Sequence, residues 1–523
     1  MLKPFDENGL FRPTETGAAL HRLAIRSAGI TVFSSGMGLA IQMIATVVLA
    51  RLLAPADFGV VTMVSTFSLL VASFGLNGFT EGILQRQQID HQLTSTLFWI
   101  NTAVGLFLTA GFAAAGSLLA WFYSNPHVTR VAAVMSINVI LTNISVIHLA
   151  LLKRAMRFSV LSANDILARA LSVATSILLG LAGWGYWALV AGTIMLPLST
   201  AIGAWTLCRW LPGRPRRVAG TGSMVRFAMN TYWHFVVSYS ARNMDNLLVG
   251  WRFGALALGF YKKAYDLFAL SASQLLSPVA PVGVAALSRV AGDPVVYKRH
   301  FLRALSILAL IGMGVSADVT LIGKDLIRVL LGPGWAEAGR IFTYFGPGIG
   351  IMLIYGTHGW MHLSLGKPER WFRWGLVELV VTGLMFLLAL PLGPAGIAIA
   401  WTASYWVLTV PAFWYAGQPV NFKVESVFGA VWKYFVAALA AGVACAALLW
   451  KLSMSFLAPS AGFAAVRAVV VSLGFVLLYL AAIVVLHGGF APLLQFWQLL
   501  PDVVPWKRLR TPPSNVIPAE SAG

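Results

Sequence analysis

The sequence predicts an all-α integral membrane protein with about fourteen transmembrane helices. Apolar stretches long enough to cross a bilayer recur from residue 28 to residue 486, with short polar breaks between them. The composition agrees, because 58% of the residues are hydrophobic, 11% are charged and the mean hydropathy is +0.78. A soluble chain of 523 residues would need more polar surface. Only helices and closed barrels satisfy their backbone in lipid, and continuous apolar runs such as 376–390 favour helices over alternating barrel strands.

Two similar halves predict how these helices are grouped. Phe58-Gly59 follows the first span and Leu258-Gly259 follows the seventh, at equivalent positions in the two halves. Both halves run in the same direction, as parallel repeats do. We therefore expect two six-helix lobes around a central cavity, followed by two C-terminal helices. The expected spans are 28–50, 59–84, 93–123, 128–151, 158–181, 184–208, 227–251, 264–288, 302–322, 338–365, 374–390, 395–415, 430–450 and 464–486.

Six segments follow from this pattern. The first is an amphipathic cytoplasmic N-terminus, in which leucine and isoleucine alternate with arginine, and the last is a cytoplasmic tail. A basic link rich in proline and arginine separates the lobes and is expected to act as a hinge. The segments are residues 1–27 (N-terminus), 28–210 (N-lobe), 211–223 (hinge), 224–418 (C-lobe), 419–489 (last two helices) and 490–523 (tail).

The net charge of +19 is explained by membrane topology. With the N-terminus inside, the inner loops hold more than twice as many Lys and Arg residues as the outer loops. This follows the positive-inside rule, so both termini are expected to be cytoplasmic and no nucleic-acid partner is needed. The two cysteines, Cys208 and Cys445, fall in separate spans and predict neither a disulfide framework nor a zinc site.

Several short motifs, spread in order over residues 25–420, resemble one bacterial family. They are Arg51-Leu-Leu-Ala-Pro-Ala-Asp-Phe-Gly59, Gly183-Trp-Gly-Tyr-Trp-Ala-Leu-Val190, Asp245-Asn-Leu-Leu-Val-Gly250 and Leu331-Gly-Pro-Gly-Trp335. Together they are similar to the polysaccharide flippases, the Wzx-like branch of the multidrug/oligosaccharidyl-lipid/polysaccharide exporter superfamily.

The resemblance implies a substrate, a location and a mechanism. Such a protein moves an undecaprenyl-diphosphate-linked oligosaccharide from the inner to the outer leaflet of the bacterial inner membrane, for exopolysaccharide or O-antigen-type polymer export. It works by alternating access, surrounded by membrane lipids, without a cofactor and without acting as an enzyme. A polymerase and export machinery are candidate partners. The chain also lacks the glycine and Ser/Thr spacing of a phosphate-binding loop around Lys324 and Lys367.

Charged residues inside the spans are the candidate site residues, because a charge at the bilayer centre costs about 3 kcal/mol or more. Arg242 and Asp245 lie three residues apart in span seven. They form either a self-neutralising pair or a site in which Arg242 meets the diphosphate and Asp245 holds it in place. Tyr239, one turn away, is a candidate for stacking against a sugar.

Two further groups of charged residues can likewise be interpreted either as structural or as part of a substrate-binding site. Lys262, Lys263 and Asp266 open span eight and form either an interfacial rim or an exit site for the headgroup. Asp165 and Arg169 in span five are four residues apart, which favours an intrahelical ion pair. The alternative places Arg169 in the first lobe opposite Arg242, so that the anion has one cation from each lobe.

Glu378 in span eleven has no obvious local partner, which makes it a candidate for ion coupling, with a structural hydrogen bond as the alternative. His358 and His362 are spaced four apart, but no acid or cysteine is nearby in sequence, so no metal is expected.

Two other classes of protein remain as alternatives. A drug or cation antiporter of the same superfamily would favour an acid-rich cavity, and a membrane glycosyltransferase or polymerase would need larger outer loops than these.

Overall fold

The computed structural model describes residues 2, 4–11, 18–76, 78–86, 88–218, 220–276, 279–451 and 460–494. Within these ranges the ordered elements are helices, and extended pairing is confined to three isolated bridges near the N-terminus. The all-α prediction is therefore confirmed. The expected amphipathic face before residue 28 and most of the tail lie outside the described side chains.

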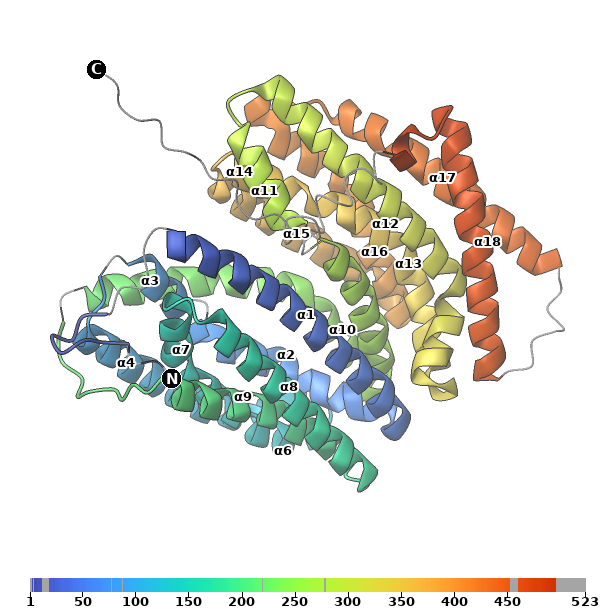
Figure 1. The fold of residues 1–523 in the computed structure, drawn as a ribbon. Helices are drawn as coiled ribbons and strands as arrows, with labels where there is room; N and C mark the ends of the chain where they lie inside the picture. The colour runs from blue at the N-terminus through green and yellow to red at the C-terminus, as the bar shows by residue number, and fades with distance from the viewer. Residues whose placement is uncertain are drawn as a thin grey trace, which may run out of the picture.

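The N-terminal helices form one group, which Figure 1 shows apart from the rest of the bundle. They pack pairwise, with α1 on α8, α8 on α9, α2 on α7 and α4 on α7. Their bounds are α1 Ala18–Leu52, α2 Pro55–Leu76, α3 Phe79–Gln85, α4 His91–Ala114, α5 Gly116–Phe122, α6 His127–Met135, α7 Ile137–Arg154, α8 Phe158–Leu181 and α9 Tyr186–Leu207.

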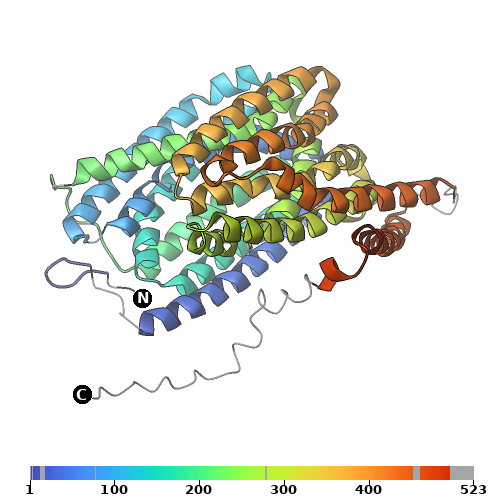
Figure 2. The same cartoon turned by 90° about the horizontal axis from the view of Figure 1, so that it is seen from above.

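The C-terminal helices form the second group. In it α12 packs against α13, α17 and α18, and Figure 1 places α17 and α18 at the outer edge of the group, the right-hand side that Figure 2 shows from above in orange and red. The bounds are α10 Thr221–Leu276, α11 Ala280–Arg289, α12 Pro294–Leu331, α13 Ala336–Gly356, α14 His358–Ser364, α15 Pro368–Ala389, α16 Gly393–Gly417, α17 Val424–Lys451 and α18 Ala461–His487, with short 3-10 turns η1 Pro333–Trp335, η2 Leu390–Leu392 and η3 Gln418–Val420.

Eleven segments of the described chain are long and apolar enough to span a membrane. Two of them, Thr221–Arg289 and Pro368–Val420, contain two passes each. Helices α13 and α14, which follow one another over residues 336–364, coincide with the expected span 338–365. The structure therefore agrees with the expected number of about fourteen.

Helix α10 changes direction at Gly254, where φ is 78° and ψ is −175°. A positive φ is accessible to glycine without the steric cost that a Cβ would bring. The break divides α10 into a first half, residues 221–253, which packs along α2, and a second half, residues 255–276, which crosses toward the C-terminal group. One long helix thus joins the two groups.

The basic link between the lobes is fastened to α4. The backbone N–H of Gly213 donates to Ser95 Oγ at 2.9 Å, and Trp99 Nε1 donates to the Gly213 carbonyl at 2.8 Å. Thr96 Oγ1 donates to the Arg216 carbonyl at 2.9 Å. Leu2 also joins this end, through an isolated bridge to Cys208 just after α9. The expected hinge is therefore held to the N-lobe over residues 213–216.

Candidate functional site

The candidate site is a cavity of about 480 Å³ between the two groups of helices. Helices α1, α7 and α8 supply its N-lobe wall, and the second half of α10 supplies the opposite wall. Most of the residues that line it have hydroxyl, amide or charged side chains. The lining residues are Thr31, Ser34, Ser35, Gly38, Leu39, Gln42, Lys153, Phe158, Leu161, Ser162, Asp165, Arg169, Leu270 and Gln274.

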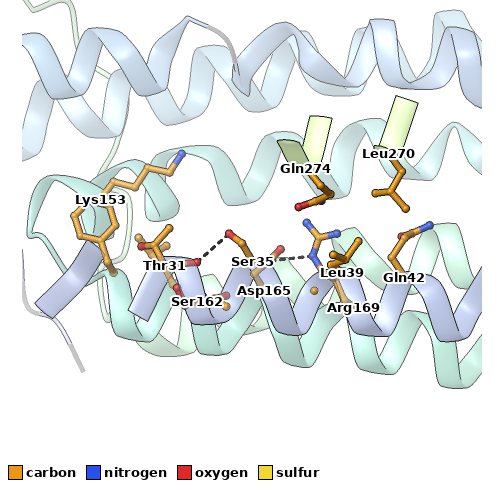
Figure 3. A pocket seen from close by; sticks show the side chains of 14 residues that line it. Thr31, Ser35, Leu39, Gln42, Lys153, Ser162, Asp165, Arg169, Leu270 and Gln274 are labelled. Carbon is orange, nitrogen blue, oxygen red and sulfur yellow. Dashed lines mark hydrogen bonds and ion pairs between the residues drawn. The ribbon is translucent and has the colours of Figure 1, made fainter. Parts of the chain in front are cut away.

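Asp165 and Arg169, which the sequence predicts as site residues, both line this cavity. They form an ion pair along α8, with Arg169 Nε donating to Asp165 Oδ2 at 2.8 Å. Figure 3 shows the guanidinium directed toward the α10 wall, where Leu270 and Gln274 project. The bond to Asp165 uses Nε, so the two terminal nitrogens of the guanidinium face the cavity. They can bind an oxyanion in the forked geometry that arginine favours.

Lys153 is a second cation of the cavity and was not anticipated from the sequence. It projects into the same space from the end of α7, and it makes no ion pair with any residue of the described chain. With Arg169 paired to Asp165, Lys153 leaves the lining with a net positive charge. The cavity is therefore suited to a ligand that carries negative charge.

The uncharged polar wall comes from one face of α1. The polar residues Thr31, Ser35 and Gln42, with Gly38 between the last two, recur every three or four residues, the period of a helix, and all four line the cavity. Polar residues at this spacing inside an apolar span are a sequence signal for a lined cavity, and that signal could have identified this wall. Hydroxyl and amide groups of this kind can hydrogen bond to sugar hydroxyls.

Asp245 does not pair with Arg242. Its side chain is fully buried, and its Oδ2 accepts hydrogen bonds from Tyr261 Oη and Trp401 Nε1, both at 2.8 Å. Arg242 is exposed and makes no hydrogen bond or ion pair with the described residues. Because Asp245 finds its donors on α10 and α16 inside the C-lobe, it holds that lobe together and leaves the guanidinium free.

Arg242 instead lies within electrostatic range of Glu378 on α15. Glu378 Oε2 accepts a hydrogen bond from Tyr355 Oη at 3.0 Å, and Tyr355 Oη in turn accepts from Trp374 Nε1 at 2.8 Å. The carboxylate expected to lack a partner therefore has one from another helix. Neither Arg242 nor Glu378 lines the cavity beside α1, so the two predicted arginines belong to different places.

The remaining predicted residues are bound within the protein. Lys262 forms an ion pair with Asp266 at 2.6 Å, and Lys263 Nζ lies 4.2 Å from the ring centroid of Phe58 in the other lobe. Tyr239 Oη donates to the Thr66 carbonyl at 2.8 Å and fastens α10 to α2. None of these four α10 residues lines the cavity.

The opposite end of the molecule is closed by contacts between the lobes. Trp335 Nε1 donates to the Ala50 carbonyl at 2.8 Å, and an Arg51 guanidinium nitrogen donates to the Val329 carbonyl at 2.7 Å. The ring of Trp335 also meets Phe58 edge-on, with centroids 5.4 Å apart. The largest buried apolar cluster runs through this region and includes residues of both lobes.

A two-lobed, multi-pass helical bundle with a polar cavity between its lobes defines the chain as a membrane protein of the transporter class. Its fold is similar to that of the lipid II flippase MurJ in an inward closed conformation, with a TM-score of 0.71 and 13% identity, over 90% of this chain and 100% of that one. An inward-facing multidrug resistance MATE family transporter of the MOP superfamily is also similar, with a TM-score of 0.60 and 13% identity, over 73% of this chain and 94% of that one.

The family follows from the sequence. Residues 48–340, more than half of the chain, match the family described as polysaccharide biosynthesis protein, and the chain belongs to that family. It is 22% identical over 373 residues to the teichuronic acid biosynthesis protein TuaB of Bacillus subtilis, covering 70% of this chain and 76% of that one. It is 21% identical over 357 residues to the succinoglycan biosynthesis transport protein ExoT of Rhizobium meliloti, covering 68% and 72%.

Proposed function

We propose that this protein is a flippase, which moves an undecaprenyl-diphosphate-linked oligosaccharide from the inner to the outer leaflet of a bacterial inner membrane. The observation that carries the proposal is the cavity between the lobes, with two cations and a neutral polar wall, in a chain of the polysaccharide biosynthesis family. A diphosphate with sugars attached presents oxyanions and hydroxyls, and both find complementary groups in this cavity.

The distribution of basic residues supports an orientation. The loops at the end of the molecule that carries Lys153 and the basic link together hold most of the Lys and Arg residues, so that end faces the cytoplasm and both termini are cytoplasmic. The cavity then lies toward the cytoplasm, and the end near Trp335 faces outward. In this state a substrate can enter from the inner leaflet and cannot leave to the outer one.

We assign roles to the lining groups in that state. Arg169 and Lys153 bind the diphosphate, Asp165 positions the Arg169 guanidinium, and the α1 wall contacts the sugars. The polyprenyl tail stays in lipid beside the cavity. The N-lobe supplies both cations, so the earlier hypothesis of one cation from each lobe is replaced by a site on one lobe.

The C-lobe residues receive later roles in the cycle. Arg242, which is exposed and without a bonding partner in the described chain, offers a second anion contact when the lobes rearrange. Glu378, held by Tyr355 beside it, is the candidate for ion coupling. Lys262, Lys263 and Asp266 lie beside the closed end and would contact the headgroup as it leaves. A polymerase and export machinery would take the product.

The test is a strain in which the gene is deleted, with the membrane face of the lipid-linked oligosaccharide measured by its access to an added glycosidase. We expect the complete repeat unit to accumulate on the cytoplasmic face and polymer export to stop. The wild-type gene should restore export, and an Arg169→Ala gene expressed at the same level should not. Complete repeat units on the outer face without polymer would contradict the proposal and favour a polymerase.

A further inference from the structure

The repeated Phe-Gly and Leu-Gly positions meet each other in the folded chain. Gly59 lies near the start of α2, and Gly259 lies near the start of the second half of α10. A Cβ added to Gly59 would fall well within 3.0 Å of the Ala255 carbonyl oxygen, and one added to Gly259 would fall equally close to the Pro55 carbonyl oxygen. Real Cβ atoms do not approach oxygen so closely. In each glycine the Cα hydrogen that occupies this place therefore points at the opposing carbonyl oxygen, as in a Cα–H···O contact.

The contact is reciprocal. Each glycine touches the carbonyl four residues before the other glycine, because Pro55 precedes Gly59 by the same interval as Ala255 precedes Gly259. Such self-complementary contacts arise where two copies of one element meet about a two-fold axis. The two repeats of this chain therefore cross through the same motif, and only glycine lets their backbones approach so closely.

The crossing lies at the closed end, among the other contacts between the lobes. The ring of Trp335 packs edge-on against Phe58 from one repeat and Phe260 from the other, with centroid distances of 5.4 Å and 5.9 Å. Its Nε1 donates to the carbonyl of Ala50, in the last turn of α1, the opening helix of the first repeat. The glycine crossing and Trp335 thus form one layer, at the end of the molecule where α1 ends and α2 begins.

We infer that this reciprocal Gly59–Gly259 crossing, with Trp335 beside it, is the outer gate of the transport cycle, and that the two helices separate here when the cavity opens outward. The inference rests on the proposed function, because alternating access requires the closed end to open. Helices in lipid associate through close packing of small residues rather than through a hydrophobic force. The two helices pack closely at these glycines when the outer end is closed. Because glycine has no side chain to interdigitate with the other helix, the helices can also separate here.

The gate makes a directional prediction for Gly59→Ala and Gly259→Ala. Each added methyl group forces the two backbones apart by about an ångström, and overpacking of this size shifts a two-state balance by about tenfold. The closed outer end should therefore lose population in both variants, by a similar factor because the contact is symmetric. Trp335→Phe keeps a ring between Phe58 and Phe260 but loses the donation to Ala50, so it should shift the balance in the same direction.

The experiment measures distances between spin labels in the full chain reconstituted in lipid, with Cys208 and Cys445 replaced by alanine. One pair of labels, at Ala182 and Lys324, reports on the outer end, and a second pair, at Gln85 and Ser288, reports on the inner end; all four sites are exposed. Matched controls are Gly111→Ala and Gly429→Ala, since nothing lies within 4 Å of a Cβ at either position.

We expect the outer pair to move to longer distances and the inner pair to shorter ones in the glycine variants and in Trp335→Phe, with no change in the controls. If folded variants keep the wild-type outer distances, the crossing is a static contact in every state and the gate is refuted. Should the glycine variants fail to fold, the Trp335→Phe distances decide in the same way. A distance shift in the variants, together with a wild-type protein that moves no lipid-linked sugar, would uphold the gate and contradict the proposed function instead.

Discussion

Replacing Arg169 with alanine separates the contribution of the ion pair to stability from its contribution to transport. The pair with Asp165 runs along one helix, and the two side chains are 42% and 49% exposed. Pairs of this kind contribute about 0.3–0.5 kcal/mol to stability. The folded protein should therefore tolerate the change, with thermal unfolding in detergent shifted by no more than a few degrees.

Transport should respond far more strongly. A hydrogen bond to a charged group contributes about 1.5–3 kcal/mol, and about 1.4 kcal/mol corresponds to a factor of ten. Loss of the guanidinium contact to a diphosphate should thus lower the rate of transport by about 10- to 150-fold. Arg169→Lys keeps the charge but loses the forked geometry, so it should fall between the wild type and Arg169→Ala.

The assay is translocation of a fluorescent polyprenyl-diphosphate oligosaccharide in proteoliposomes, with thermal unfolding measured on the same preparations. Arg340→Ala is the matched control, because Arg340 pairs with Glu337 along α13 with similar exposures of 53% and 41% and lies outside the cavity. Wild-type transport by folded Arg169→Ala would refute the assignment. An equal loss in Arg340→Ala would show that the effect is not specific to the cavity.

Four further outcomes are expected. Arg242→Ala should leave thermal unfolding unchanged, since Arg242 has no bonding partner in the described chain, but should slow transport; an unchanged rate at equal membrane levels would remove it from the site. Arg467→Ala removes the partner of the buried Asp325 carboxylate and should lower the free energy of unfolding by about 3 kcal/mol in denaturant titrations; a loss under about 0.5 kcal/mol would contradict this. Glu378→Gln should keep the bond from Tyr355 but abolish any effect of an imposed pH gradient on transport, and a retained effect would exclude it as the coupling group. The Cys208 thiol is fully buried, so it should resist maleimide until the protein is denatured; rapid labelling of the folded protein would disagree.

The arrangement of the site was only partly predictable. Asp165 and Arg169 were recognisable because their spacing along one helix is a local property, and the structure adds that they face a cavity. Lys153 was counted only as a loop cation, since the sequence gives no sign that its side chain, near the end of α7, lines the cavity. The α1 wall also has a periodic pattern in the sequence, but its residues are uncharged. A search for charged residues inside the spans, based on the cost of burying a charge, does not select them.

The C-lobe shows the limit of spacing arguments more clearly. Arg242 and Asp245 are close on one helix, yet Asp245 takes its hydrogen bonds from Tyr261 and Trp401, the latter 156 positions away in sequence. A buried carboxylate is stabilised by whichever donors surround it, and those donors come from other helices. Glu378 likewise finds Tyr355 on α13, so its apparent lack of a partner was a property of the sequence neighbourhood alone.

By itself the sequence determined the class of protein, the helical fold, the number of passes, the pairing of two repeats and the bias of charge between the two membrane faces. These properties depend on composition, period and order along the chain, and the lipid environment permits few alternatives. The tertiary structure alone decided which charges share a cavity, which are bound within a lobe, and that Gly59 and Gly259 meet. Those outcomes depend on how helices that are distant in the sequence pack together, because the hydrogen bonds and close contacts between helices are set by the positions of the helices in space.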